Sequence, residues 1–243
     1  MKVAVAVLSI MSLSFASMYF GPDMIPGARA GGRAAAAARR VQPELERDLA
    51  AAGLRLGDPV FVRIFKHESE LEVWVRSDDR YALFRTWPIC TWSGELGPKL
   101  RQGDRQSPEG FYSVGRSQLN PASRFHLSFN LGYPNAYDRA HGRTGDFLMV
   151  HGNCVSIGCY AMGDAQIEQI YTLLAAALDN GQARADVHVF PFRFDRPPQA
   201  DWRAQRWGEF WADLEQGFDA FERTRVPPRI EVRQKRYRVE ARD

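Results

Sequence analysis

The most informative stretch of the chain reads His151-Gly152-Asn153-Cys154-Val155-Ser156-Ile157-Gly158-Cys159-Tyr160-Ala161-Met162. It follows the apolar run Phe147 to Val150, which predicts a buried strand that delivers His151 at its carboxyl end. A loop of small residues then leads to Cys159 and can fold back so that the two side chains meet. A thiol is a nucleophile only as the thiolate, and a neighbouring histidine can take its proton. The spacing therefore predicts Cys159 as a nucleophile with His151 as its base.

The residues beside Cys159 are suited to an acyl-transfer site. Gly158 leaves room next to the thiol for a substrate. The backbone N–H groups of Gly158 and Cys159 can point into the same pocket and bind an oxyanion. Ser156 is a candidate substrate contact.

Other interpretations of the same stretch stay open. Cys154 and Cys159 can form a disulfide, although so short a loop gains little entropy from it. His151 and the two cysteines can bind zinc, but no fourth ligand and no Cys-x-x-Cys pair is evident. Cys159 can also be a buried structural thiol without chemistry. A reversible Cys154–Cys159 disulfide that switches the activity off is a further hypothesis, motivated only by spacing. We expect no metal and no cofactor.

The amino terminus has the pattern of an export signal. Lys2 precedes an apolar segment, Val3 to Phe20, and Ala28 and Ala30 resemble a cleavage site. We favour a cleaved signal peptide within residues 1–30. The apolar segment can also span a bilayer core of about 30 Å as a retained anchor, so association with the inner membrane stays open. We expect an exported protein of a bacterial periplasm. Its three cysteines, an odd number, leave at least one thiol unpaired there.

The rest of the chain predicts a mainly β domain with attached helices. Residues 31–57 form an amphipathic helix or a helical linker, because Val41, Leu45 and Leu49 recur every four residues. A second helix is expected from an N-cap at Asp164 to residue 180. Segments rich in β-branched and aromatic residues predict strands at 60–65, 71–75, 81–86, around Cys90 and Trp92, at 111–114 and at 187–190. Residues 120–141 are interpreted as a long structured loop.

Residues 195–243 form an extension with an aromatic helix and a basic tail. Large apolar residues recur at helical spacing from Trp207 to Phe221, which is typical of a helix packed on its own domain. A partner-binding helix is the alternative. Pro227-Pro228 separates this helix from a charged tail that can form strands. The formal net charge is only +3 and no basic platform carries interleaved aromatics, so we expect a solvated edge and no nucleic-acid partner.

The residues around Cys159 resemble the YkuD-type L,D-transpeptidases. The run Ser156 to Met162 is similar to the family's Ser-x-Gly-Cys-hydrophobic-Arg-Met signature, and the upstream His-Gly matches His151-Gly152. The family's Thr-Pro-x-Gly-x-Tyr/Phe turn is similar to residues 107–112. The likeness covers residues 60–194. It is closer still to a periplasmic YafK-like subgroup, which is similar over residues 97–99, 101–104 and 134–142. Some of that subgroup are amidases that detach an outer-membrane lipoprotein from peptidoglycan.

The resemblance implies a mixed β-sandwich catalytic domain at residues 58–194, a thioester on Cys159 and peptidoglycan stem peptides containing meso-diaminopimelate as substrate. Ala161 stands where the family has Arg, and the eight-residue step from His151 to Cys159 is short for the family. Both departures favour hydrolysis of the diaminopimelate–lipoprotein amide. A transpeptidase that forms cross-links or attaches lipoprotein is the alternative, and a non-catalytic wall-binding module is the second.

Four further residues are candidate substrate contacts. Lys99, Arg101 and Arg139 can hold stem-peptide carboxylates, because guanidinium forks in particular match carboxylates, or they can be solvated loop charges. Tyr137 can shape the cleft.

The role of His141 and the group that orients His151 have more than one interpretation. We interpret His141 as a loop residue rather than a second catalytic histidine. The group that orients His151 stays open between a backbone carbonyl, Asp138 and Asp146.

Overall fold

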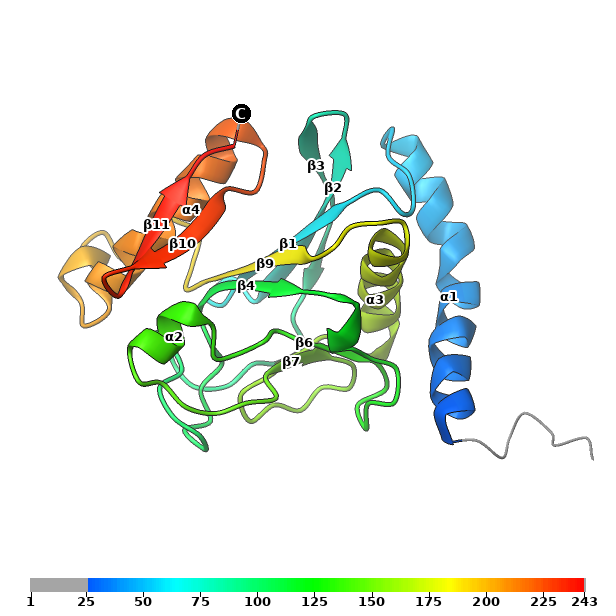
Figure 1. The fold of residues 1–243 in the computed structure, drawn as a ribbon, viewed down its shortest axis with the longest axis horizontal. Helices are drawn as coiled ribbons and strands as arrows, with labels where there is room; N and C mark the ends of the chain where they lie inside the picture. Colours follow the sequence, from blue (N-terminus) through cyan, green and yellow to red (C-terminus); the bar gives the residue numbers. More distant parts are fainter. Residues whose placement is uncertain (1–25, 243) are drawn as a thin grey trace, which may run out of the picture.

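The computed structural model describes residues 26–242, so most of the expected leader lies outside the described residues. A five-stranded sheet has the order β3 (Arg80–Pro88), β2 (Glu70–Ser77), β1 (Val60–Phe65), β9 (Ala185–Phe190) and β4 (Gly110–Val114). A four-stranded sheet has the order β5 (Leu119–Asn120), β6 (Ser128–Asn130), β7 (Met149–His151) and β8 (Tyr160–Ala161). The helices are α1 (Pro26–Ala51), α2 (Ala136–Ala140), α3 (Asp164–Asp179) and α4 (Gly208–Thr224). The predicted class, mainly β with attached helices, is confirmed (Figure 1).

Strand β1 is buried on both faces, and its sequence explains why. Val60, Val62 and Ile64 belong to the core shared with α1 and α3, whereas Phe61 and Phe65 belong to aromatic clusters that include residues of α4. Successive side chains of a strand point to opposite faces of the sheet. A central strand between two helical layers is therefore apolar at almost every position. Figure 1 shows these layers, with α1 and α3 on one side and α4 on the other.

The strand predictions in this sheet are confirmed except for the one around Cys90 and Trp92. β1 pairs antiparallel with β2, β2 with β3 and β4 with β9, and β1 pairs parallel with β9. After Pro88 the chain makes a single bridge, Thr91 with Ala161, instead of a strand. Proline lacks a backbone donor and so ends the ladder of β3. The next residues cross to the second sheet.

The second sheet is built from short strands that the sequence signalled only in part. β7 ends at His151, as predicted from the apolar run before it. The segment predicted as an irregular loop, 120–141, includes β6 and α2. Strands of two or three residues are too short to show an alternating pattern in the sequence.

Helix α1 is part of the domain. Ala37, Val41, Leu45 and Leu49 are buried in the main core, on the side where α1 packs against α3. The predicted helix is confirmed, and of its two interpretations the packed amphipathic helix is the one observed. Among the described residues, no helix is both long and apolar enough to cross a bilayer.

Helix α3 begins as predicted, but its cap is different. The N-cap is Gly163, with φ of 81°, and not Asp164. The Asp164 carboxylate instead accepts the backbone N–H of Asn153 at 2.7 Å. The acidic residue is thus used to hold the loop that follows His151.

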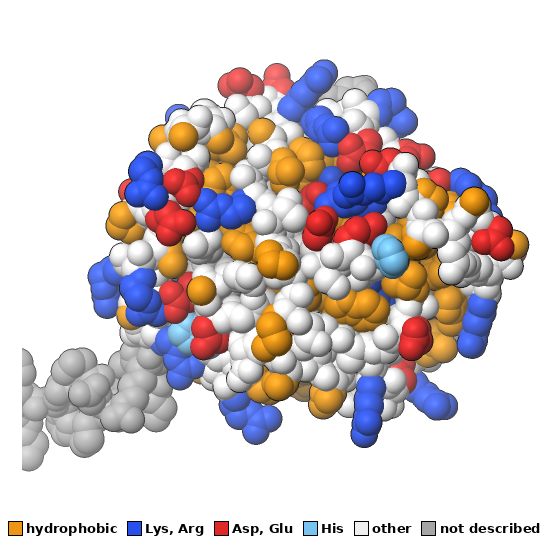
Figure 2. All heavy atoms as spheres, turned by 180° about the vertical axis from the view of Figure 1, so that it is seen from behind, with side chains coloured by type: hydrophobic (Ala, Val, Ile, Leu, Met, Phe, Trp, Pro, Cys, Tyr) orange, Lys and Arg blue, Asp and Glu red, His pale blue; other side chains and the backbone are white. Residues whose placement is uncertain are grey.

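The C-terminal extension packs on the domain through its aromatic residues. The buried apolar positions of α4 are Phe210, Trp211, Leu214, Phe218, Ala220 and Phe221, so the predicted packed helix is confirmed. The charged tail forms a hairpin of β10 (Arg229–Arg233) and β11 (Arg236–Glu240). Arg236 is bonded to the buried Asp213 of α4. On the face shown in Figure 2, basic and acidic side chains are intermingled.

A fully buried ion pair joins the sheet to the extension. Lys66 Nζ lies 3.0 Å from Glu109 Oε1 and also donates to the carbonyls of Glu95, Gly97 and Ser107. The other Glu109 oxygen accepts Trp211 Nε1–H of α4 at 2.8 Å. Burial lowers the pKa of Lys66, and the Glu109 charge opposes that shift. Both charges are therefore compensated only while the pair is intact.

Removing one member of this pair is expected to be costly. Lys66→Met leaves the Glu109 carboxylate buried without its cation, so we expect a loss of about 3–5 kcal/mol in unfolding free energy. Arg47→Met, which removes an exposed partner of Asp48, is the control and costs under about 1 kcal/mol. Urea unfolding measures both, and Lys66→Met/Glu109→Gln should recover part of the loss. A Lys66→Met protein as stable as the control contradicts this account.

Candidate active site

The parallel pairing of β7 and β8 brings the two predicted catalytic residues together. Val150 pairs with Tyr160 and His151 with Ala161, so Cys159 lies just before β8 at the level of Met149. The backbone N–H of Met149 points to Cys159 Sγ, 3.4 Å away. Cys159 and His151 line one cavity of about 480 Å³. The predicted thiol and histidine therefore lie in the wall of the same cavity.

His151 is buried and held in one orientation. Its Nδ1 lies 2.5 Å from the carbonyl oxygen of Gly152, and its ring stacks on Phe125 with centroids 4.7 Å apart. The orienting group is therefore the backbone carbonyl, one of the alternatives left open; Asp138 is bonded to Arg143 and Tyr112 instead. Because Nδ1–H donates to a carbonyl, the neutral ring presents Nε2 as its acceptor. Burial lowers the pKa of His151, which keeps the ring neutral and able to accept a proton near pH 7.

The Cys159 thiol is protonated in the resting site. Burial raises its pKa, while the Met149 N–H and the Lys99 charge act in the opposite direction. With the pKa of His151 lowered and that of Cys159 raised, both groups are uncharged at neutral pH. The thiol must then lose its proton during attack, when a base beside it is needed.

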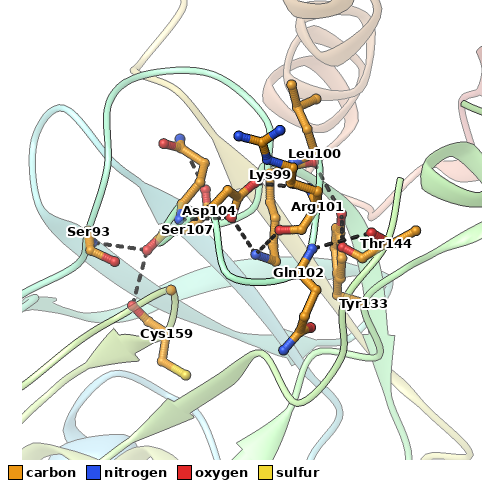
Figure 3. Close-up of polar contacts among 12 residues, drawn as sticks. Ser93, Lys99, Leu100, Arg101, Gln102, Asp104, Ser107, Tyr133, Thr144 and Cys159 are labelled. Carbon is orange, nitrogen blue, oxygen red and sulfur yellow. Dashed lines mark hydrogen bonds and ion pairs between the residues drawn. The ribbon is translucent and has the colours of Figure 1, made fainter. Parts of the chain in front are cut away.

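Serine hydroxyls hold the backbone of the nucleophile. The Cys159 carbonyl accepts a hydrogen bond from Ser156 Oγ at 2.7 Å. It also accepts one from Ser107 Oγ at 3.1 Å, and Ser107 Oγ in turn accepts the N–H of Ser93 (Figure 3). The Gly158 N–H, a predicted oxyanion donor, donates to Ser156 Oγ at 3.2 Å. Ser156 therefore organises the loop. Its role as a substrate contact and the role of the Cys159 N–H as an oxyanion donor remain predictions.

The cysteine pairing differs from each alternative considered for Cys154. Cys154 is bonded to Cys90, 64 residues away, and Cys159 is free. The proposed Cys154–Cys159 disulfide, structural or switching, is therefore wrong, as is a zinc site that uses Cys154. Within residues 26–242, no group of three or more His, Cys, Asp or Glu side chains is arranged to hold a metal. The disulfide ties the loop after His151 to the segment that follows β3.

The loop from residue 99 to 104 forms another wall of the cavity. Lys99, Gln102 and Gly103 line it. Lys99 Nζ is bonded to the Asp104 carboxylate and to the Arg101 carbonyl, and Asp104 also accepts the N–H groups of Leu100 and Arg101 (Figure 3). Lys99 thus contributes a positive charge near the thiol, but its ammonium is already paired.

The other predicted substrate contacts lie away from this cavity. Arg101 lines a separate hollow beside Trp207. Arg139 lines a cavity of about 370 Å³ between β4, β9 and the hairpin. Tyr137 is buried and stacks on Tyr237 and on His141, whose ring contacts the Lys235 carbonyl. Only Lys99 and Ser156, of the five predicted contacts, lie beside Cys159.

Several cavity residues were missed from the sequence. Arg124, Phe125, Phe147 and Ile157 all line the Cys159 cavity. Arg124 and Phe125 come from the irregular segment before β6, where no spacing or motif marks them. For Ile157 the available signal was its place within the Cys159 motif, two residues before the nucleophile.

The fold and the site agree with the L,D-transpeptidase family. The chain belongs to the YkuD family, because the family model for the L,D-transpeptidase catalytic domain matches residues 60–189. The chain is 47% identical over 184 residues to a protein of Escherichia coli K12 named "Putative L,D-transpeptidase YafK", covering 76% of this chain and 75% of that protein. The counterpart from E. coli O157:H7 gives the same values. The protein is a YafK-like member of a family that acts on peptidoglycan.

Solved structures give a more distant match. The helical cell shape determining protein Pgp2 of Campylobacter jejuni, as its K307A mutant, is 22% identical with a TM-score of 0.46, covering 68% of this chain and 56% of that one. Bd1075 of Bdellovibrio bacteriovorus is 20% identical with a TM-score of 0.38, covering 56% of this chain and 49% of that one. This chain thus spans little more than half the length of Pgp2.

Thiol counting tests the cysteine assignment. Because Cys90 and Cys154 are paired, we expect one thiol to react with a chromogenic disulfide in the denatured, unreduced protein and three after reduction. Cys159→Ala should leave none before reduction. Two different outcomes contradict the assignment: three reactive thiols before reduction, or one that survives in Cys159→Ala.

The pH dependence of alkylation tests the raised pKa of the Cys159 thiol. A raised pKa means that the reaction of Cys159 with iodoacetamide should have its midpoint above the value of about 8.5 for an ordinary cysteine. Lys99→Met should move the midpoint further up, since a nearby cation is lost. Arg101→Met, which alters a charge outside the cavity, is the control. A midpoint below that of a model thiol contradicts the resting state described above.

Proposed function

We propose that the protein is a periplasmic thiol amidase that hydrolyses the bond between meso-diaminopimelate and a covalently attached lipoprotein. One observation carries the proposal: Cys159 and a neutral, oriented His151 line the same cavity in a YafK-like member of the L,D-transpeptidase family. The family gives the substrate class. The exposed apolar side chains at the mouth of the cavity and the buried Ala161 favour an amide that joins the wall to a polypeptide.

The reaction follows from the two side chains. The Cys159 sulfur attacks the amide carbonyl carbon while His151 Nε2 takes the thiol proton, and the backbone N–H of Cys159 binds the oxyanion. His151 returns that proton to the leaving lipoprotein amine as the C–N bond breaks, which leaves a thioester. Water then attacks the thioester, His151 takes its proton, and the C–S bond breaks. The products are a carboxylic acid and an amine, and Cys159 regains its proton.

The mouth of the cavity favours a substrate with a polypeptide arm. Phe147 is 67% exposed, Val155 54% and Ile157 81%, although each is a large apolar side chain. Phe147 and Ile157 line the cavity, and Val155 lies just before Ile157 in the same loop. Stem peptides of alanine, glutamate and diaminopimelate have no large apolar side chains. A lipoprotein chain supplies them, and their burial on this rim favours binding by about 1.5–3 kcal/mol for each side chain fully covered.

The position of Ala161 also favours this reaction over ordinary cross-linking. Ala161 is fully buried, paired with His151 across β7 and β8 and bridged to Thr91. Alanine carries no polar side chain, so the polar contact expected of the family's Arg is missing here. Transpeptidation, in which an amine replaces water, is the second candidate and uses the same thioester.

The disulfide supports the expected compartment. A bond between Cys90 and Cys154 persists in an oxidising environment, such as the periplasm, and not in a bacterial cytosol. This agrees with the export signal expected within residues 1–30. Fractionation of cells that make the full-length protein tests the localisation, and a cytosolic, fully reduced protein contradicts it.

Lipoprotein-bearing sacculi test the function. The native protein should release lipoprotein with a new carboxylate on the stem peptide, as read by mass spectrometry, and Cys159→Ala should release none. New cross-links or newly attached lipoprotein would indicate transpeptidation instead. Equal lipoprotein release by the native protein and by Cys159→Ala rules out Cys159 as the nucleophile.

The apolar rim is tested separately. Val155→Ser/Ile157→Ser should lower lipoprotein release at least about tenfold, since a loss of 1.4 kcal/mol is already a factor of ten. Its rate of Cys159 alkylation should stay native. Leu83→Ser, an exposed apolar residue on β3, is the matched control. If Val155→Ser/Ile157→Ser releases lipoprotein at the native rate, the rim does not bind the polypeptide arm.

A further inference from the structure

The segment between β5 and β6 contacts His151 in two ways. The Phe125 ring stacks on the imidazole, with centroids 4.7 Å apart and planes inclined by 27°. The Leu127 carbonyl accepts the N–H of Gly152 at 3.1 Å. Gly152 is the residue whose carbonyl holds Nδ1 of His151. The segment therefore supports both the ring and the group that orients it.

The two contacts restrict different motions of the imidazole. The bond from Nδ1 to the neighbouring carbonyl fixes one edge of the ring but lets the ring rock about that edge. A flat aromatic surface against the ring face opposes the rocking. Together they keep Nε2 pointing in one direction, and a small displacement of a catalytic group from its reacting partner can cost about 100-fold in rate.

The same segment is held from the other side by α1. The Arg33 guanidinium donates to the carbonyls of Ser123 and His126, both at 2.8 Å. These two carbonyls flank Phe125 in the chain. His126 has φ of 67°, a conformation that non-glycine residues seldom adopt and that external contacts must hold. The His126 ring also contacts Glu168 of α3 at 2.7 Å, and Glu168 is bonded to Arg40 of α1.

Phe125 has no other evident reason to be aromatic. It is half-exposed and lies on the wall of the catalytic cavity, so it contributes less to the core than a buried aromatic does. Arg33 is exposed as well, yet its guanidinium reaches across to a segment 90 residues away in sequence. Phe125 and Arg33 thus contribute little to the core. Both act on the 123–127 segment, which contacts His151, the predicted general base.

We propose that Phe125 is a positioning residue for His151 and that α1, through Arg33, keeps Phe125 in place. The inference rests on the role of His151 as the base in the proposed function. It adds that helix α1 is required for an efficient active site, and not only for the core. Loosening Arg33 lets the 123–127 segment shift and leaves the imidazole free to rock.

The test combines activity with a direct measurement on His151. Phe125→Leu should lower kcat for lipoprotein release about 10- to 100-fold with little change in KM, and Arg33→Gln should act in the same direction with a smaller effect. Phe125→Tyr keeps the aromatic face and should restore the native rate. Arg39→Gln, which removes another exposed arginine of α1, is the control.

The pKa of His151 is measured by NMR titration of labelled histidine. A purely structural role of Phe125 and Arg33 would leave this pKa unchanged. Loss of the covering ring should bring the pKa of His151 back up toward about 6.5 in Phe125→Leu and part of the way in Arg33→Gln. Arg39→Gln and Phe125→Tyr should titrate like the native protein. Because no substrate is used, this result stands even if lipoprotein is not released. Native titration and native kcat in both Phe125→Leu and Arg33→Gln would overturn the proposal.

Discussion

The active site depends on one pairing, the parallel alignment of β7 with β8. Parallel strands ordinarily need a crossover of a dozen or more residues, whereas Val150 and Tyr160 are joined by a short loop. The loop is held from outside by the Cys90–Cys154 disulfide, the Asp164 carboxylate on Asn153 and the Ser107 hydroxyl on the Cys159 carbonyl. Within the loop, the Ser156 hydroxyl donates to the same carbonyl. These contacts from outside the loop keep Cys159 at the level of Met149, in the same cavity as His151.

The core of the protein and its chemistry are connected through Ser107. The buried Lys66 ammonium donates to the Ser107 carbonyl, and the Ser107 hydroxyl donates to the Cys159 carbonyl, each at 3.1 Å. Glu109, two residues on, binds Lys66 and α4. The C-terminal extension therefore acts on the same loop that supports the nucleophile. From the opposite side of the sheet, α1 and α3 support the base.

The sequence predicts local features of this protein better than long-range ones. Strands β1, β2 and β9 and helix α3 follow from patterns within a few residues, and so does the proximity of His151 to Cys159. The bond between Cys90 and Cys154 joins positions 64 apart and depends on how two sheets meet, which no local pattern encodes. For the same reason Phe125 was missed, and Arg101 and Arg139 were placed with the substrate although the fold turns them to other cavities.

The central claim is that a thioester on Cys159 carries the reaction, and trapping that intermediate tests it most directly. Peptidoglycan fragments that bear lipoprotein are mixed with the protein, quenched in acid during turnover and examined by intact-protein mass spectrometry. We predict an adduct with the mass of the stem-peptide fragment on the peptide containing Cys159, removable by neutral hydroxylamine and absent in Cys159→Ala. Lipoprotein release at the native rate by Cys159→Ala, or an adduct on another residue, would contradict it.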